Sequence, residues 1–234
     1  MGVDAMSRVR IGSVRLNWTG PYDGPPAPHL LRGAIGARFS DNPLFHQHAE
    51  GGSVYRYPRV QYRWDAGSGV IAGFGEGVEA LLDLPWPGLT LRLGSREMTV
   101  LDVTTELHEH NIQPTDRLRR YHFRSPWLPF NQENYARYRA MSPPEEAAER
   151  DRLCVAGILM ALRGLQVQFE HRLYAAFHPK AAKPCRYKDQ TMLGLLGDMV
   201  ANVDLPDGLA IGRAVSHGYG WLVRESEGVP QPTV

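Results

Sequence analysis

The chain has 234 residues, of which 43% are hydrophobic, enough apolar material for one large domain or two small ones. The formal net charge is only +1, so no strong overall field points to a polyanionic partner. The two cysteines, Cys154 and Cys185, have no CxxC spacing, which excludes a cysteine zinc site and a disulfide scaffold. Without a membrane-length apolar run or a signal-peptide core, we expect a soluble cytoplasmic protein with no membrane partner.

The first half of the chain predicts the order strand, helix, strand, strand, helix, strand. Apolar residues alternate along the expected strands and recur every three or four residues in the expected helices. The expected elements are a strand at 8–18, a helix at 29–39, a strand at 53–64, a strand turning into a helix at 69–84, and strands at 89–93 and 97–109. Pro58 interrupts the second strand and favours an edge strand or a bulge there. This order is the split βαβ pattern of a ferredoxin-like domain.

From Arg119 the pattern restarts. The expected elements are a strand at 119–127, a short helix from 131, a long helix at 143–165, a strand at 167–177, and two strands around a glycine-rich turn at 208–224. The long helix is the strongest prediction, because two prolines open it and acidic residues fill its first turn. We therefore expect an α+β fold with an N-terminal domain at 1–112, a C-terminal domain at 113–226 and a disordered polar tail at 227–234.

The segment FHQH contains a pair of histidines, His46 and His48, that would share one face of a strand. A zinc site would need at least one more donor, and His108 and His110 repeat the same spacing. An imidazole pKa near neutrality also suits general acid–base catalysis. Surface histidines without a role are the third interpretation, and the sequence leaves all three open.

Two glycine clusters invite a phosphate-binding interpretation. GFGEG at 73–77 lacks a following lysine, so a tight strand-to-helix turn explains it best. In IGRAVSHGYGW at 211–221, glycines surround Arg213, His217 and Tyr219, and backbone N–H groups there could approach a phosphate. An ordinary hairpin explains this second cluster equally well.

Arginine dominates the cations, and the only lysines, Lys180, Lys183 and Lys188, lie in one short window. Base composition of the genome explains the arginine bias as well as a preference for planar guanidinium groups at phosphates does. A solvated loop is the ordinary explanation for the lysine window. However, cations alternate with aromatic residues both there and at 55–63, which favours RNA binding over other binding functions.

The segments HLLRGAIGARF, LFHQH, YRYPRVQYR, GFGEGVEALLDL, FRSPWLPFNQENYARY and DLPDGLAIGRAVSHGYGWL together resemble the CRISPR-associated Cas-six family of precursor-crRNA endoribonucleases. The resemblance follows the whole chain in order and is nearest to the branch with a YRYPxxQYK-like strand. The short length also suits the Cas-six-like processing subunit of a type IV system. The resemblance implies tandem ferredoxin-like domains of the RAMP type and a glycine-rich loop near the C-terminus.

The resemblance further implies cleavage of CRISPR repeat RNA without a metal or other cofactor. The 2′-hydroxyl attacks the adjacent phosphate, which leaves a 2′,3′-cyclic phosphate and a 5′-hydroxyl. Such chemistry needs a base, a proton donor and cations that stabilise the phosphorane charge. Members of the family often stay bound to the crRNA as subunits of an effector complex.

The same resemblance suggests the residues involved. His48 and His46 are the first acid–base candidates, His29 is the next, and Arg32 and Arg38 could stabilise charge from the first helix. Where a family member dispenses with histidine, arginine and tyrosine would do this work. The RNA would be held by Arg56, Arg59, Arg63, Lys180, Lys183, Arg186, Lys188, Arg213, His217 and Tyr219. The alternative function is a non-catalytic crRNA-binding subunit, which would need the basic clusters but not the histidines.

Overall fold

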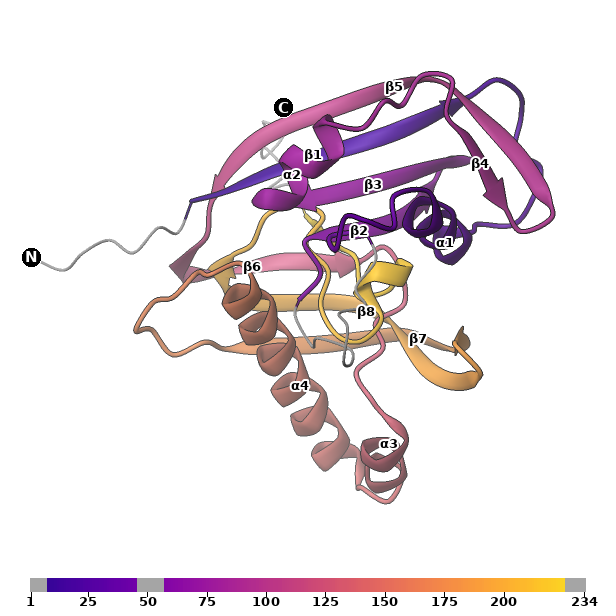
Figure 1. Ribbon diagram of the computed structural model, residues 1–234. Coiled ribbons are helices and arrows are strands. Elements are labelled where there is room, and N and C mark those ends of the chain that lie inside the picture. The colour runs from indigo at the N-terminus through magenta and orange to yellow at the C-terminus, as the bar shows by residue number, and fades with distance from the viewer. Residues whose placement is uncertain (1–7, 46–56, 226–234) are drawn as a thin grey trace, which may run out of the picture.

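The computed structural model describes residues 8–45 and 57–225, whose strands form two antiparallel sheets (Figure 1). The first sheet has the order β2-β3-β1-β5-β4, and α1 and α2 pack on it. Its elements are β1 (Arg8–Trp18), α1 (Pro28–Arg38), β2 (Val60–Asp65), β3 (Ser68–Phe74), α2 (Glu76–Leu82), β4 (Thr90–Leu93) and β5 (Arg96–Asn111). When the short β4 is set aside, four strands remain in the order β2-β3-β1-β5, with β1 and β3 in the centre. This is the strand order of a split βαβ domain, so the prediction from the sequence is confirmed.

The second sheet repeats this plan with the order β7-β8-β6-β9. Its elements are β6 (Gln113–Phe123), α3 (Gln132–Tyr138), α4 (Pro143–Gly164), β7 (Ala175–Tyr187), β8 (Gln190–Asp204) and β9 (Leu222–Arg224). A second crossover helix is replaced by the glycine-rich segment 205–221, which contains one 3-10 turn, η1 (Val215–His217). The chain therefore has an α+β fold with two ferredoxin-like units in tandem.

The long helix α4 begins where the sequence predicted. Pro143 occupies the first helical turn, and the carboxylate of Glu145 accepts a hydrogen bond from the Ser142 backbone N–H at 2.7 Å. Ile158 and Leu162 lie one turn apart on its buried face. The helix thus covers the second sheet with an apolar stripe, and Asp151 accepts a hydrogen bond from the Phe177 backbone N–H at 2.8 Å.

The alternation along β1 serves two cores at once. Val14 and Leu16 point toward α1 and belong to the core between the first sheet and its helices. Val9 and Ile11 point to the opposite face, where they join a second core that includes Ile158 of α4. That second core crosses from one unit to the other, so the two sheets share buried apolar surface.

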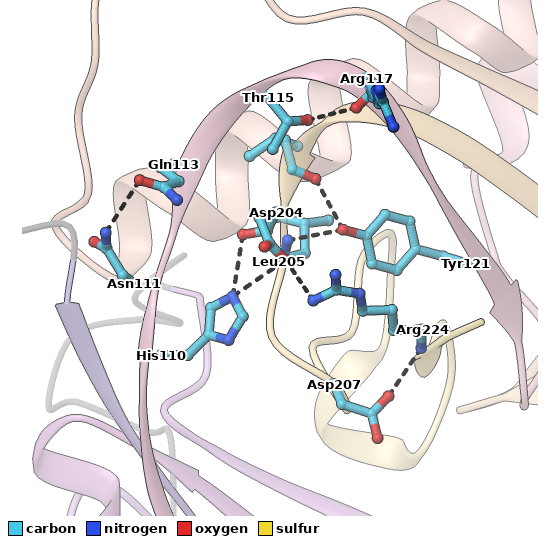
Figure 2. Close-up of polar contacts among 11 residues, drawn as sticks. His110, Asn111, Gln113, Thr115, Arg117, Tyr121, Asp204, Leu205, Asp207 and Arg224 are labelled. Atoms are coloured by element: carbon cyan, nitrogen blue, oxygen red, sulfur yellow. Dashed lines mark hydrogen bonds and ion pairs between the residues drawn. The ribbon is translucent and has the colours of Figure 1, made fainter. Parts of the chain in front are cut away.

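A polar network fixes the passage from β5 to β6, as Figure 2 shows. Nε2 of His110 lies 3.5 Å from Oδ1 of Asp204, and the same carboxylate oxygen accepts a hydrogen bond from Arg224 at 3.0 Å. The Tyr121 hydroxyl donates to the Val203 carbonyl and accepts from the Leu205 backbone N–H, both at 2.8 Å. These contacts hold β5, β6, β8 and β9 at one junction.

Three sequence expectations in the second half are wrong. The strand expected at 167–177 begins only at Ala175, where pairing with Ala201 of β8 starts. The lysine window at 178–190 is an extended hairpin rather than a loop, and its two prolines fit because β7 is an edge strand. The strand expected near 208–212 is reduced to a single bridge between Ala210 and Trp221, because the glycines there form turns.

Candidate functional site

Three segments from distant parts of the sequence meet beside the N-terminus of α1. The 3-10 turn η1 packs against α1 and against β2. The tip of the β7–β8 hairpin lies on the other side, because the Tyr187 ring is 5.0 Å from the His217 ring, centroid to centroid. We call the group His29, Arg32, Lys188 and His217, with Tyr187, the α1 cluster.

His217 is half-buried within the α1 cluster. Burial, together with the charges of Arg32, His29 and Lys188, lowers its pKa from 6.5 to about 4, and burial is the largest cause. The imidazole is therefore neutral at pH 7 and has a ring nitrogen that can accept a proton.

The cations around His217 are available to a ligand. Within residues 8–45 and 57–225, neither Arg32 nor Lys188 forms an ion pair, and Lys188 is exposed at the hairpin turn. His29 and Arg32 are three residues apart and share a face of α1. No described side chain caps the start of α1, and the backbone N–H groups of its first turn add positive potential, so this cluster favours an anion such as phosphate.

Glycines allow the turn that carries His217 to approach α1. Gly218 has φ +87°, and a Cβ atom there would lie 2.7 Å from Cγ of Pro28. Gly220 has φ +71°, and a Cβ atom there would overlap the carbonyl oxygen of Ile211. The Tyr219 hydroxyl then donates a hydrogen bond to the Arg186 carbonyl at 2.8 Å, which ties the turn to the β7–β8 hairpin.

Tyr62 lies in the core beneath α1. Its side chain is 1% exposed, and its hydroxyl has no hydrogen-bond partner among the described residues. Burial raises the pKa of Tyr62, while the charge of Arg32 acts in the opposite direction. Tyr62 stays a neutral phenol near the α1 cluster.

The remaining predicted cations do not all gather here. Arg38 lies nine residues from His29, about 14 Å along the helix axis at 1.5 Å per residue. Lys180 forms an ion pair with Asp198 at 2.7 Å, whereas Lys183 and Arg186 are exposed on β7. Arg213 donates its backbone N–H to the Leu128 carbonyl at 3.0 Å.

Arg63 and Arg59 occupy internal positions that argue against contact with RNA. Arg63 is 6% exposed, donates to the Gly208 carbonyl and to Gln61, and lies 4.8 Å from the Trp221 ring. Burial lowers its pKa to about 10. Arg59 is largely covered and faces Glu76 at 4.0 Å. The sequence did not reveal this burial, because alternation suggests that only one face of a strand is covered.

The first-ranked histidines, His46 and His48, lie outside the described residues, as does Arg56. The last described residue before them, Phe45, packs in the core with α1. The first described residue after them, Tyr57, donates a hydrogen bond from its hydroxyl to the Ala210 carbonyl at 2.7 Å. No group of three or more histidine, cysteine, aspartate or glutamate side chains within the described ranges could hold a metal ion. Of the second histidine pair, His110 faces Asp204, whereas His108 is exposed.

Two family models together match residues 11–225. The Cas6b N-terminal domain matches residues 11–113, and the Cas6b C-terminal domain matches residues 113–225. The chain belongs to the Cas6b family. This confirms the resemblance noted in the sequence and identifies the branch, because both models describe Cas6b.

Solved structures share the fold of this chain. A crystal structure of Cas6b superimposes with a TM-score of 0.83 at 24% identity, covering 93% of this chain and all of the other. A second crystal structure, of the CRISPR RNA processing endoribonuclease Cas6b, gives 0.70 at 22% identity with the same coverage. An uncharacterized protein of Methanocaldococcus jannaschii is 30% identical over 108 residues, which are 46% of this chain and 74% of that protein. No helix in the described ranges is long and apolar enough to cross a membrane.

Proposed function

We propose that this Cas6b protein cleaves CRISPR repeat RNA to release crRNA, and that it does so at the α1 cluster. The observation that carries the proposal is the meeting of a neutral imidazole, His217, with Arg32 and Lys188 near the start of α1, where neither cation forms an ion pair with a described residue. Family membership supplies the substrate class, and the cluster supplies groups suited to a phosphate.

The reaction proposed is attack by the 2′-hydroxyl on the adjacent phosphate without a metal ion. The attack places additional negative charge on the phosphate oxygens, and Arg32 and Lys188 are positioned to stabilise it. Guanidinium and ammonium groups fixed in advance by the protein lower the barrier without reorganising during the reaction. The products would be a 2′,3′-cyclic phosphate and a 5′-hydroxyl.

Proton transfer completes the reaction. His29 is exposed at the second position of α1 and can reach a ligand held at the cluster. His46 and His48 stay acid–base candidates from the resemblance, and Arg38 stays a candidate for stabilising charge from the far end of α1. The α1 cluster favours Arg32 over Arg38, because Arg32 lies beside His217.

We propose that the exposed cations near the cluster hold the RNA on either side of the cleaved bond. Lys183, Arg186 and Lys188 follow one another along the β7–β8 hairpin, and Tyr219 is hydrogen-bonded to that hairpin. After cleavage the protein would remain on the crRNA within an effector complex with other subunits. A burst equal to the enzyme concentration, followed by slow turnover, is the kinetic result expected of such retention.

The test is cleavage of end-labelled repeat RNA from the host array in EDTA, with mass spectrometry of the products. Cyclic-phosphate ends are expected, and a 2′-deoxy substitution at the cleaved nucleotide should abolish the reaction while preserving binding. Cleavage of the 2′-deoxy substrate would contradict 2′-hydroxyl attack. Tight binding of the unmodified repeat without cleavage would favour the alternative, a non-catalytic crRNA-binding subunit.

A further inference from the structure

We propose that the pocket between α3 and the β7–β8 hairpin binds the base of one unpaired nucleotide near the cleaved bond of the repeat RNA. This inference rests on the proposed function. It adds a contact to a base, whereas contacts to phosphate, as in the α1 cluster, carry no sequence information. The pocket has a volume of about 290 Å³. We call it the α3 pocket, and its lining includes Tyr135, Ala182, Lys183, Thr191, Met192 and Leu193.

The size and lining of the α3 pocket suit a single planar ring system. Its volume lies at the small end of the range for ligand pockets, about 300–1,000 Å³, so it offers room for one base rather than for several. Met192 and Leu193 provide half-buried apolar surface. Tyr135 provides an aromatic ring on which a base can stack, as unpaired bases do on aromatic side chains in RNA-binding proteins.

The short helix α3 holds Tyr135 in place. The Asn131 side chain accepts a hydrogen bond from the Asn134 backbone N–H at 2.7 Å and so caps the helix. The Tyr138 hydroxyl donates to Glu146 of α4 at 3.2 Å, which ties α3 to the long helix. The Tyr135 ring lies 6.0 Å from the Phe130 ring, centroid to centroid. A stacking surface fixed in advance loses little side-chain entropy when it binds.

Three polar groups of the lining are open to a ligand. The hydroxyl groups of Tyr135 and Thr191 and the ammonium group of Lys183 form no side-chain hydrogen bond or ion pair with another described residue. Hydroxyl groups can donate to or accept from the edge of a base, and an ammonium group can donate to a base or a phosphate. An apolar protein side chain would leave all three groups without a partner. None of the described lining residues is acidic, so their charge also favours an anionic chain.

Arg186 connects the α3 pocket to the α1 cluster. It lies opposite Thr191 in the β7–β8 register, so the two side chains are direct cross-strand neighbours. Its carbonyl accepts the hydrogen bond from Tyr219 of the glycine-rich segment. Lys183 and Lys188 are at most about 18 Å apart, the span of five extended residues. RNA with a phosphate at the α1 cluster can therefore place a nearby base in the α3 pocket.

The test is binding of uncleavable repeat RNA, made so by a 2′-deoxy group at the cleaved nucleotide, to the intact protein. Each RNA in the series has one abasic nucleotide at an unpaired position near the cleaved bond. One abasic position should weaken binding by the wild type about 5- to 100-fold, in the range of a lost base–aromatic stack. Tyr135→Leu should weaken binding of the intact RNA by a similar factor.

The decisive result is the combination of the two changes. If Tyr135 contacts that base, Tyr135→Leu should change the affinity for the RNA that is abasic there by less than about twofold, because the contact is already lost. Tyr174→Leu is the matched control, since Tyr174 is 55% exposed and outside the α3 pocket. In Tyr174→Leu the penalty for the abasic position should stay as in the wild type.

A second variant guards against an effect of Tyr135→Leu on folding. Ala182 is exposed on the edge strand β7, so Ala182→Phe can fill the pocket without removing a polar group. It should also remove the penalty for the same abasic position. Circular dichroism and thermal unfolding establish that each variant is folded.

Two outcomes would overturn the proposal. One is an abasic penalty that is equal in the wild type and in both pocket variants at every position. The other is unchanged RNA binding by both pocket variants together with loss of assembly with effector subunits, which would assign the pocket to a protein side chain. A wild type that binds repeat RNA without cleaving it would instead overturn the proposed function, and the binding series would still decide the role of the pocket.

Discussion

His217 and Arg63 show how burial changes what a charged or titratable side chain can do. Both were expected to bind RNA, Arg63 because it alternates with aromatic residues and His217 because it lies in a glycine cluster that could approach a phosphate. In the structure His217 is partly buried beside three positive charges, whereas Arg63 is enclosed and its hydrogen bonds go to Gln61 and Gly208. The first is suited to chemistry and the second to holding the fold.

The low pKa of His217 links stability to pH. Between pH 6.5 and about 4 the unfolded chain binds a proton at this position that the folded chain does not, so stability falls as the pH falls through this window. The shift corresponds to at most about 3 kcal/mol. His217→Gln should lose less stability than the wild type between pH 7 and pH 4.5 in urea unfolding. Parallel loss in both proteins would contradict the shift.

Replacement of Arg63 tests its structural role. Arg63→Met preserves the length of the side chain but leaves the Gly208 carbonyl without its donor and removes the contact with Trp221. We expect a loss of about 2–4 kcal/mol in the free energy of unfolding, as for other broken buried polar networks. Arg38→Met, at an exposed position, should change stability by about 0.5 kcal/mol or less. Equal effects from both variants would contradict the structural role.

At the scale of elements, local patterns in the sequence predicted most strands and helices. Alternation predicted β1 and the pair β4 and β5, and helix-start signals predicted α4. Pro58 favoured an edge strand or a bulge at β2, and β2 is an edge strand. Alternation of apolar residues could not predict the first residue of β7, because the strand begins where its pairing with β8 begins. It also misassigned the lysine window, since a highly exposed edge hairpin has the composition of a loop.

The glycine-rich segment 205–221 depends on backbone conformations that only glycine adopts freely. Gly220→Ala should destabilise the protein by about 2–3 kcal/mol, because its Cβ would overlap the Ile211 carbonyl and strain the backbone at φ +71°. Gly88→Ala is the matched control: its φ is +80°, but nothing lies within 4 Å of the added carbon. That variant should cost only about 1–2 kcal/mol, and a Gly220→Ala protein as stable as Gly88→Ala would contradict the account.

At the scale of the whole molecule, the two ferredoxin-like units share a core. Val9, Ile11 and Phe74 of the first sheet pack in one cluster with Trp127 and Met199 of the second unit. Neither unit can therefore bury its apolar surface alone. The boundary after residue 112 stays a prediction of where one structural domain ends and the next begins. We do not expect the two domains to fold independently.

Thermal unfolding tests the shared core. We expect one cooperative transition, with a calorimetric enthalpy equal to the van't Hoff enthalpy. Two resolved transitions, or a folded fragment of residues 1–112 with native stability, would show that the units are independent.

The candidate site could be predicted only in parts. Sequence patterns and the family resemblance pointed to His29, Arg32 and the glycine-rich segment separately, but His29 and His217 lie near opposite ends of the chain. Their meeting depends on how segment 205–221 packs against α1 and β2, which no local pattern encodes. Burial of Arg63 escaped prediction for a related reason, since β2 is covered on both faces by segments remote in sequence.

The central claim is that RNA is cleaved at the N-terminal end of α1, and two arginines of that helix test it directly. Single-turnover cleavage of repeat RNA in EDTA should be compared for Arg32→Gln and Arg38→Gln: Arg32 lies one turn after His29, whereas Arg38 is the last residue of α1. The account predicts a loss of at least about 30-fold for Arg32→Gln, as expected when a group that stabilises transition-state charge is removed, and little change for Arg38→Gln. A loss confined to Arg38→Gln would contradict the account and move the chemistry to the other end of the helix.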